Sequence, residues 1–368
     1  MRVLIIGGGV GGLAASIGLA RHGIESVVFE QGESETGAGL SLWSNAMRVL
    51  RWLGVEREAL AAGSLIERTV TVTCGGRPIA EMDIAGLGRE AGAPSICIAR
   101  AELRKILLHR ISLDRLKTSA RCVSYAVREH SVIAHMADGS TAKGDLLVGA
   151  DGIHSIARAK LLGSAEPRYA GYTCWRGLVT GDWLKAGTAM VAMGRGTHAG
   201  LFPCGSHQAY WFGTVNAPAR ATVDLSSLID SWPEPIAAAI RATSPGEILR
   251  NDIFDRAPAA VWGQGPVTLL GDAAHPATPN LGQGACQALE DAKVLTECLL
   301  ENRPAGESLR AYERLRMPRT AMVTREARNL GRLLQIENPI VMPLRDMAAR
   351  TTLAQRMAMQ LFRRMLVD

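Results

Sequence analysis

The sequence predicts an α/β fold in which a doubly wound parallel sheet is interrupted by an inserted antiparallel sheet and followed by C-terminal helices. Three observations predict it. The chain begins with a strand, a glycine-rich turn, a helix and a second strand. Two later blocks of short alternating stretches indicate antiparallel strands, and the residues after 304 have helical periodicity. With 368 residues, of which 47% are hydrophobic, the chain is long enough to bury a large core.

The N-terminal unit has the pattern of a βαβ crossover. Residues 3–6 form a continuous apolar run, residues 7–12 contain the glycine turn, and residues 13–20 place apolar side chains on one helical face. Gly23 ends this helix, and residues 26–30 form a second buried strand. A helix that connects two buried strands is typical of a parallel sheet.

The remaining strands belong to two different sheets. Residues 145–150 and 267–270 have the pattern of further buried parallel strands. Antiparallel strands are predicted at 69–74, 79–84, 189–194, 200–204 and 209–215, the first two joined as a hairpin. The first domain is therefore discontinuous. It comprises residues 1–68, 98–165 and 262–335, the inserted sheet domain comprises residues 69–97 and 166–261, and residues 336–368 form a C-terminal helical segment.

Composition and charge exclude several classes of protein. The net charge of +6 comes from residues 301–368, which contain 13 arginines, no lysine and 7 acidic residues. These arginines alternate with Leu and Met at helical spacing, so nucleic-acid binding is not predicted. No apolar run is long enough for a transmembrane helix, no signal peptide is recognisable, and a cytoplasmic protein is expected. The seven cysteines lack the spacing of metal ligands, so no metal site is predicted.

The glycine turn has the form Gly7-x-Gly9-x-x-Gly12, between a strand and a helix. Gly7 permits the tight turn, Gly9 lets a pyrophosphate approach the backbone, and Gly12 lets the helix pack closely on the strand. Glu30 ends the second strand at the position that accepts hydrogen bonds from an adenosine ribose, and Gln31 follows it. This pattern predicts a dinucleotide site.

Two further motifs place an acidic residue after a buried strand. Asp151 lies in Gly-Ala-Asp-Gly at residues 149–152, just before a predicted helix. Asp272 follows the strand at 267–270, and a glycine-rich helix start with Gly282, Gly284 and Ala285 comes ten residues later. An acid can bind a ribityl hydroxyl, and the amides of a helix N-terminus suit the flavin N1–C2=O edge, which becomes negative on reduction.

With these three motifs in this order, the chain resembles the single-component FAD-dependent aromatic hydroxylases of the p-hydroxybenzoate and salicylate hydroxylase type. The resemblance covers nearly the whole chain. It implies a Rossmann-like FAD-binding domain of the GR2 type, non-covalent FAD, and NAD(P)H as reductant. Arg100, in Ile-Ala-Arg-Ala-Glu-Leu at residues 98–103, matches the family arginine that contacts FAD.

The resemblance also implies the reaction and its partners. In this family NAD(P)H reduces FAD, O₂ adds at C4a, and the hydroperoxide transfers one oxygen to an electron-rich substrate. The expected partners are a small aromatic or heteroaromatic substrate and O₂, and the expected assembly is a monomer or homodimer. In relatives the substrate lies between the flavin and the inserted sheet.

Candidate substrate residues follow from strand alternation on that sheet. His198, with Phe202, is expected on one face, and Tyr210 and Phe212 on the same face of the partner strand. His198 and Tyr210 are the candidate catalytic residues, because a histidine poised near neutral pH suits removal of a phenolic proton. The candidate substrate-binding residues are Arg176, Arg195, Phe202 and Phe212. A core histidine and a packing tyrosine are the competing interpretations.

Two other functions remain open at this point. Residues 171–175, Gly-Tyr-Thr-Cys-Trp, also resemble flavin epoxidases of apolar isoprenoid-like substrates, and seven of the 13 methionines follow residue 300. A non-catalytic protein that keeps the FAD fold is the third hypothesis, although the intact third motif argues against it.

Overall fold

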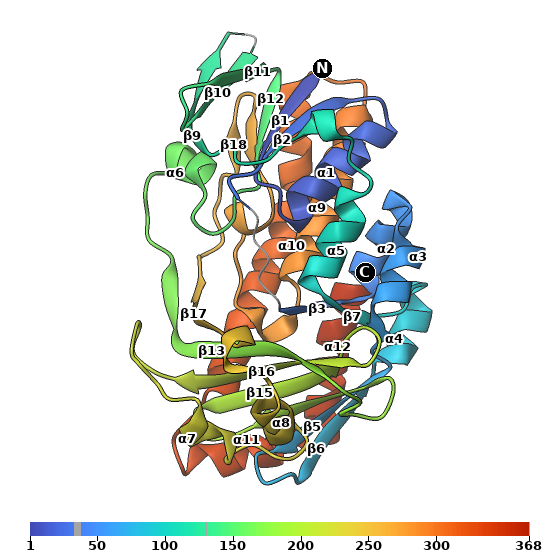
Figure 1. Ribbon diagram of the computed structural model, residues 1–368, viewed down its shortest axis with the longest axis vertical. Coiled ribbons are helices and arrows are strands. Elements are labelled where there is room, and N and C mark those ends of the chain that lie inside the picture. The colour runs from blue at the N-terminus through green and yellow to red at the C-terminus, as the bar shows by residue number, and fades with distance from the viewer. Residues whose placement is uncertain (33–37, 130, 368) are drawn as a thin grey trace.

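The computed structural model describes residues 1–32, 38–129 and 131–367. Figure 1 shows an elongated molecule with the N-terminal parallel sheet at one end and a large sheet at the other. The long helix α10 (Ala305–Leu334) connects the two, because its first half packs on the parallel sheet and its last residue, Leu334, packs against the large sheet at Met193. A site between the sheets is therefore built from segments distant in sequence.

The first sheet has the strand order β18-β19-β12-β1-β2-β8. Its strands are β1 (Arg2–Ile6), β2 (Glu25–Phe29), β8 (Leu116–Lys117), β12 (Leu146–Gly149), β18 (Gly263–Gln264) and β19 (Val267–Leu269). All neighbours are parallel except β18 and β19. The predicted βαβ unit is confirmed, with α1 (Val10–Arg21) as its crossover helix.

The chain also forms helices and two small sheets outside the two main sheets. The helices are α2 (Ser44–Leu53), α3 (Glu56–Ala62), α4 (Ile84–Ala91), α5 (Arg100–Leu108), α6 (Ile156–Leu162) and α9 (Gly284–Leu300), and the short 3₁₀ turns are η1 (Leu113–Arg115), η3 (Gly271–Ala273) and η4 (Pro279–Leu281). The small antiparallel sheets are β3 (Gly39–Leu42), β7 (Ile96–Ala99) and β4 (Ser64–Leu65), and β11 (Thr141–Gly144), β10 (Ser131–Met136) and β9 (Cys122–Arg128). These two sheets were not predicted.

The large sheet has seven strands in the order β17-β13-β16-β15-β14-β5-β6. They are β5 (Arg68–Thr73), β6 (Pro78–Asp83), β13 (Arg168–Thr180), β14 (Thr188–Met193), β15 (Thr197–Pro203), β16 (Gln208–Asn216) and β17 (Leu249–Asp255). The β5–β6 hairpin is confirmed. One pair, β5 and β14, is parallel, because the two strands come from separate insertions and no short turn sets their direction.

The two faces of the large sheet have different surroundings. One face carries Trp175, Leu201 and Trp211, which pack with Ile236 and Ile240 of α8 (Ile236–Arg241) in a separate apolar cluster. The neighbouring short elements on this side are α7 (Ser226–Ile229) and η2 (Pro245–Glu247). The opposite face looks toward the parallel sheet and C-terminal helices. It carries the candidate residues Arg176, His198, Phe202, Tyr210 and Phe212.

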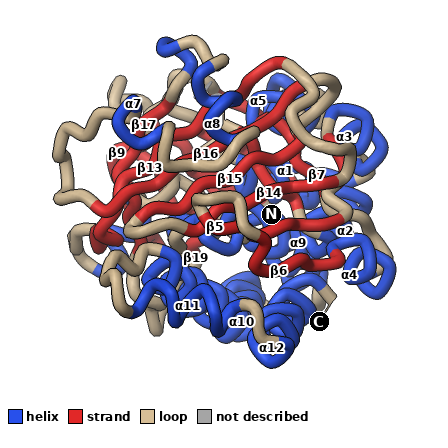
Figure 2. The backbone as a smooth tube through the Cα atoms, turned by 90° about the horizontal axis from the view of Figure 1, so that it is seen from below, coloured by secondary structure: helices blue, strands red, loops and turns tan. Residues whose placement is uncertain are grey.

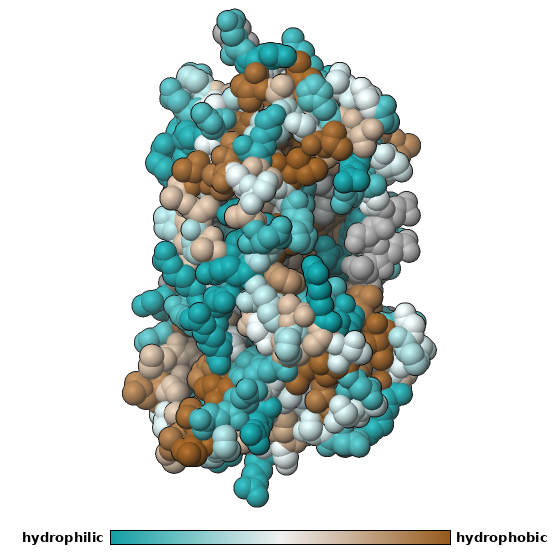
Figure 3. All heavy atoms as spheres, turned by 90° about the vertical axis from the view of Figure 1, so that its left-hand side faces the viewer, coloured by the Kyte–Doolittle hydropathy of each residue, from teal (hydrophilic) through white to brown (hydrophobic). Residues whose placement is uncertain are grey.

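The C-terminal helices lie along one side of the large sheet, next to β5 and β6 (Figure 2). After α10 come α11 (Val341–Ala349) and α12 (Thr352–Leu366), both of which contact β6. On the face drawn in Figure 3, hydrophobic residues form small patches separated by hydrophilic ones. Among the described residues, no helix combines the length and the apolar character that crossing a membrane requires.

Candidate active site

A cavity of about 1100 Å³ lies between the glycine turn, the carboxyl ends of the parallel strands and the large sheet. It brings together residues from all three motifs and from the inserted sheet. The predicted site residues that line it are Gly7, Gly9, Glu30, Gln31, Arg100, Asp151, Arg176, His198, Phe202, Tyr210, Phe212, Asp272, Gly282, Gly284 and Ala285. Two predicted site residues are not among those that line it: Gly12 lies beneath the turn, and Arg195 lies in the turn between β14 and β15.

The glycine turn has the geometry that the fingerprint predicts. Gly7 has φ +105°, and a Cβ there would lie 2.3 Å from the Ala150 carbonyl oxygen. A Cβ at Gly12 would lie 2.0 Å from the Gly7 carbonyl oxygen, so only glycine lets the helix approach this closely. At Gly9, in contrast, no protein atom lies within 4 Å of the Cβ position. The turn thus leaves room for a ligand above Gly9.

Glu30 stands next to the turn with its carboxylate fixed by the backbone. Its two oxygens accept the Gly8 N–H at 2.6 Å and the Gly32 N–H at 3.0 Å. Because a carboxylate has about four acceptor positions, Glu30 retains capacity to bind ribose hydroxyls.

Asp151 joins the second motif to the start of α6. Its Oδ2 accepts the Ile156 N–H at 2.8 Å, while its Oδ1 is buried without a hydrogen-bond partner among the described residues. Burial raises the pKa of Asp151. A buried acceptor without a partner is costly, so a donor from a bound ligand would stabilise this arrangement.

Asp272 and the N-terminus of α9 form the opposite wall. The Asp272 side chain faces the open cavity, but it lies deep within the protein. This burial raises its pKa, and the nearby His275 and Arg100 partly offset the increase. Gly282 has φ +62°, and a Cβ there would lie 2.9 Å from the indole nitrogen of Trp43. Since the first N–H groups of a helix lack intrahelical partners, the amides at Gly284 and Ala285 offer donors to the cavity.

The cavity face of the large sheet carries an aromatic wall. The rings of Phe202, Tyr210 and Phe212 have centroids 6.3 to 6.4 Å apart, and His198 lies 5.0 Å from Phe212. Pairing of β15 with β16 sets Gly200 opposite Phe212, and a Cβ at Gly200 would lie 2.4 Å from that ring. The predicted alternation is confirmed. Flat rings arranged in this way suit a planar aromatic ligand.

The titration of His198 differs from the prediction of a histidine poised near neutral pH. Burial, together with nearby Arg345, lowers the pKa of His198 to about 4. The imidazole is therefore neutral at pH 7. It can accept a hydrogen bond, but it is a weaker base than an ordinary histidine. Burial also raises the pKa of Tyr210, so that side chain is a neutral hydroxyl.

The two candidate arginines have different positions. Arg176 lines the cavity, and its Nη2 donates to Asn251, while its Nε is buried without a partner among the described residues. Arg195 does not line the cavity. It follows β14 in the turn to β15, where Nε donates 2.9 Å to the Glu337 carbonyl, so the structure places this predicted substrate-binding residue outside the cavity lining.

The sequence profile of the FAD binding domain family matches residues 1–327. The chain belongs to this family of FAD-dependent monooxygenases. It is 37% identical to the aurachin C monooxygenase/isomerase of Stigmatella aurantiaca, covering 97% of this chain and 95% of that protein. It is 34% identical to the 3-amino-4-hydroxybenzoate 2-monooxygenase of Streptomyces cremeus, with 96% and 92% covered.

Solved structures agree with this assignment. The Klebsiella pneumoniae protein HpxO, crystallised with FAD and uric acid, is 30% identical, with a TM-score of 0.89 over 95% of this chain and 92% of that one. The match to FAD-dependent monooxygenases means that the hypothesis of a non-catalytic protein is not retained.

The residues of this monooxygenase fit FAD. The open space at Gly9 and the amides of the turn suit the pyrophosphate, Glu30 suits the adenosine ribose, and Asp272 suits the ribityl chain. The amides at the α9 N-terminus, where Gly284 and Ala285 line the cavity, would suit the flavin pyrimidine edge.

A buried ionic network beneath the third motif was only partly anticipated. His275 lies in the segment 271–284 that carries the third motif, which we call the flavin loop, and its Nε2 lies 2.6 Å from Asp291, which also accepts the Gly271 N–H at 2.9 Å. Arg316 of α10 donates to the other Asp291 oxygen at 2.6 Å. Although burial opposes it, His275 and Arg316 lower the pKa of Asp291 to about 2. No local motif reveals the partnership of Asp291 with Arg316.

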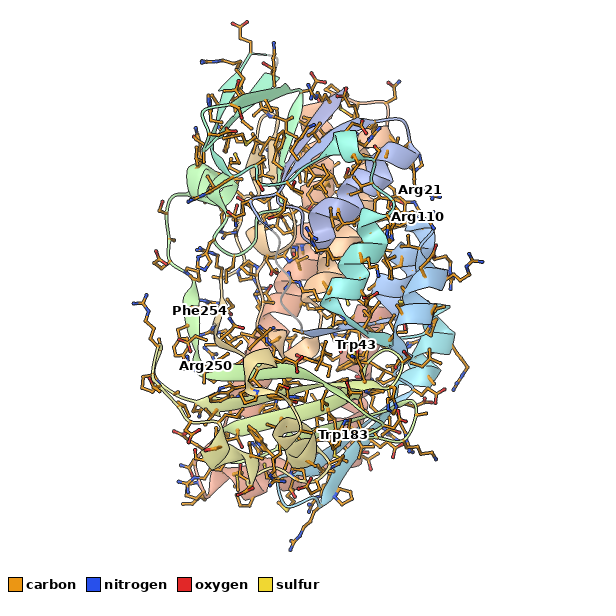
Figure 4. The ribbon with its side chains drawn as sticks, viewed as in Figure 1. Arg21, Trp43, Arg110, Trp183, Arg250 and Phe254 are labelled. Carbon is orange, nitrogen blue, oxygen red and sulfur yellow. The ribbon has the colours of Figure 1, made fainter. Side chains whose placement is uncertain are left out.

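Two other bracing residues were not predicted. Arg158, buried in α6, donates to the carbonyls of Ala273 and Ala274 at 3.0 and 2.9 Å, and so ties the second motif to the third. Trp43, labelled in Figure 4, lies between the sheets, and its indole N–H donates 3.1 Å to Leu281 in the flavin loop. Arg158 follows the second motif by six residues, and this closeness was the available signal in the sequence.

Proposed function

We propose that the protein uses NAD(P)H and O₂ to hydroxylate the ring of a small aromatic or heteroaromatic compound, bound between FAD and the large sheet. The supporting observation is the aromatic wall of Phe202, Tyr210 and Phe212, which shares one cavity with all three cofactor motifs. Relatives named for the hydroxylation of urate and for the monooxygenation of 3-amino-4-hydroxybenzoate support a ring of this kind.

FAD supplies the activation of O₂ and the transfer of one oxygen atom. The protein positions the ring. His198, neutral at pH 7, accepts a hydrogen bond from a ring hydroxyl or N–H, and Tyr210 donates one from its hydroxyl. The buried Nε of Arg176 gains a partner when the substrate carries a carboxylate or carbonyl group. The aromatic wall excludes water from the ring face.

The test is a panel assay with phenols, hydroxybenzoates, pyridines and purines. Compounds are scored when they accelerate NAD(P)H-dependent flavin reduction and are themselves oxygenated. For an accepted compound, His198→Ala should retain FAD but lose about tenfold in product formation, the effect of one hydrogen bond. His207→Ala serves as the control, because His207 is exposed and pairs with Asp182 at 3.0 Å.

Two results would contradict the proposal. One is a panel in which no compound is oxygenated although the flavin is reduced. The other is a His198→Ala protein that retains FAD and oxygenates the ring as efficiently as the His207→Ala control.

One observation favours the epoxidase hypothesis: the part of the cavity beside the C-terminal helices is mainly apolar and would suit an isoprenoid-like substrate. An isoprenoid alcohol in the same panel separates the two reactions, because epoxidation gives an epoxide or a diol and leaves aromatic rings unchanged.

A further inference from the structure

The cavity continues past the aromatic wall to the β6 edge of the large sheet. Paired residues form a row across the strands: Phe212 opposes Gly200, Gly200 opposes Val191, Val191 opposes Thr71, and Thr71 opposes Ala80. Neighbouring strands lie about 4.8 Å apart, so the three steps from β15 to β6 span roughly 14 Å. We call this part of the cavity the arm. Its floor consists of small side chains.

The C-terminal helices form the roof of the arm. Ala349 of α11 and Ala354 and Ala358 of α12 line the cavity, together with Leu334 at the end of α10. Figure 2 shows these three helices beside β5 and β6. Small residues thus line the arm above and below along this row, and the larger side chains of Ile79, Met193 and Leu334 border it where the end of α10 packs on the sheet.

The arm offers little to a charged ligand. Among the described residues, the ionisable side chains that border it are Arg345 and Glu81. Arg345 is buried, donates to the carbonyls of Gly194 and Leu334 at 3.2 Å, and pairs with the adjacent Asp346. Glu81 is exposed at the sheet edge. The Arg345 charge is paired with Asp346, although its Nη2 has no hydrogen-bond partner among the described residues, and Glu81 pairs with Arg68 at 3.5 Å. The space between Arg345 and Glu81 is mainly apolar.

We propose that the arm binds a linear apolar chain attached to the substrate ring, so that the substrate class is an aromatic compound with an alkyl or isoprenoid-like chain. The inference rests on the proposed function, because the ring must occupy the aromatic wall for the chain to enter the arm. Burying each methylene should tighten binding about fourfold until the arm is full.

The experiment measures the binding of 4-alkylphenols, from methyl to nonyl, to the FAD-loaded protein through the change in flavin absorption. Two variants, Ala358→Phe and Ala349→Phe, fill the arm from different helices. Met357→Phe is the matched control, since Met357 lies on the outer side of α12 with 61% of its surface exposed. FAD content is measured for every variant.

In the wild type and in Met357→Phe, affinity should rise with chain length and then level off. In an arm-filling variant that retains FAD, the gain should disappear for long chains while 4-methylphenol binds as in the wild type. A flat dependence on chain length in the wild type would overturn the inference, as would equal long-chain affinities in all three variants. Oxygenation of chain-free rings together with either result would leave the proposed hydroxylase function intact.

Discussion

Replacement of His198 by glutamine should change how the stability of the protein depends on pH. Burial lowers the pKa of His198 to about 4, against an ordinary value of 6.5. The unfolded chain therefore binds a proton below pH 6.5 that the folded protein does not accept until pH 4. Wild-type stability should fall as the pH drops through this window, and His198→Gln removes this contribution because glutamine does not titrate.

The size of the effect follows from the two pKa values. Each pKa unit corresponds to ~1.4 kcal/mol, so complete protonation would cost about 3 kcal/mol. Between pH 7 and pH 5, where the unfolded chain is already protonated and the folded protein is not, the cost should be about 2 kcal/mol. Other titrating groups affect both proteins equally, and the comparison of the two isolates His198.

The assay is urea unfolding with saturating FAD at pH 7 and pH 5, followed by tryptophan fluorescence. The difference in unfolding free energy between wild type and His198→Gln should shift by about 2 kcal/mol between the two pH values. Parallel pH profiles of wild type and His198→Gln would refute the reasoning, because they would mean that the imidazole has water or a partner that holds its proton.

Three further substitutions test the cofactor side. Gly12→Ala should abolish FAD retention or folding, because its Cβ would lie 2.0 Å from the Gly7 carbonyl; a yellow, stable variant would contradict this packing. Asp272→Ala should weaken FAD binding about 10- to 100-fold by removing a charge-assisted hydrogen bond, measured by titration of the flavin-free protein with FAD. Asp291→Ala should lower the free energy of unfolding, measured by heat or urea, by ~3–5 kcal/mol, because it leaves the buried charge of its partners unpaired. A decrease below ~1 kcal/mol would mean that His275 and Arg316 find other partners.

The parts of the site that the sequence predicted are those whose chemistry is local. The glycine fingerprint is a set of backbone requirements within six residues, and Gly7 and Gly12 meet them as predicted. Strand alternation has a period of two, so it placed His198 and Tyr210 on one face without knowledge of the sheet order.

What the sequence did not predict depends on contacts across the fold. The pKa of His198 follows from its burial under segments far along the chain, not from its neighbours in sequence. Arg195 lies outside the cavity lining, and its hydrogen-bond partner is the backbone of Glu337, 142 residues later. The pairing of Asp291 with Arg316 joins two helices, and neither helix carries a motif for it.

The C-terminal segment connects the cofactor side of the cavity with the proposed substrate side. Phe362 of α12 meets Trp43 edge to face with ring centroids 5.6 Å apart, and Trp43 in turn donates to Leu281 of the flavin loop. The same helix places Ala354 and Ala358 over the arm. Ala358, which lies over the arm, is therefore only about one helical turn from Phe362, whose contact with Trp43 supports the flavin loop. Because the contact of Phe362 with Trp43 supports the loop that belongs to the cofactor site, a substitution near Phe362 should also disturb FAD binding. Substitutions that adapt the arm to a different substrate should therefore be tolerated better at Ala354, which lies farther from Phe362 along α12.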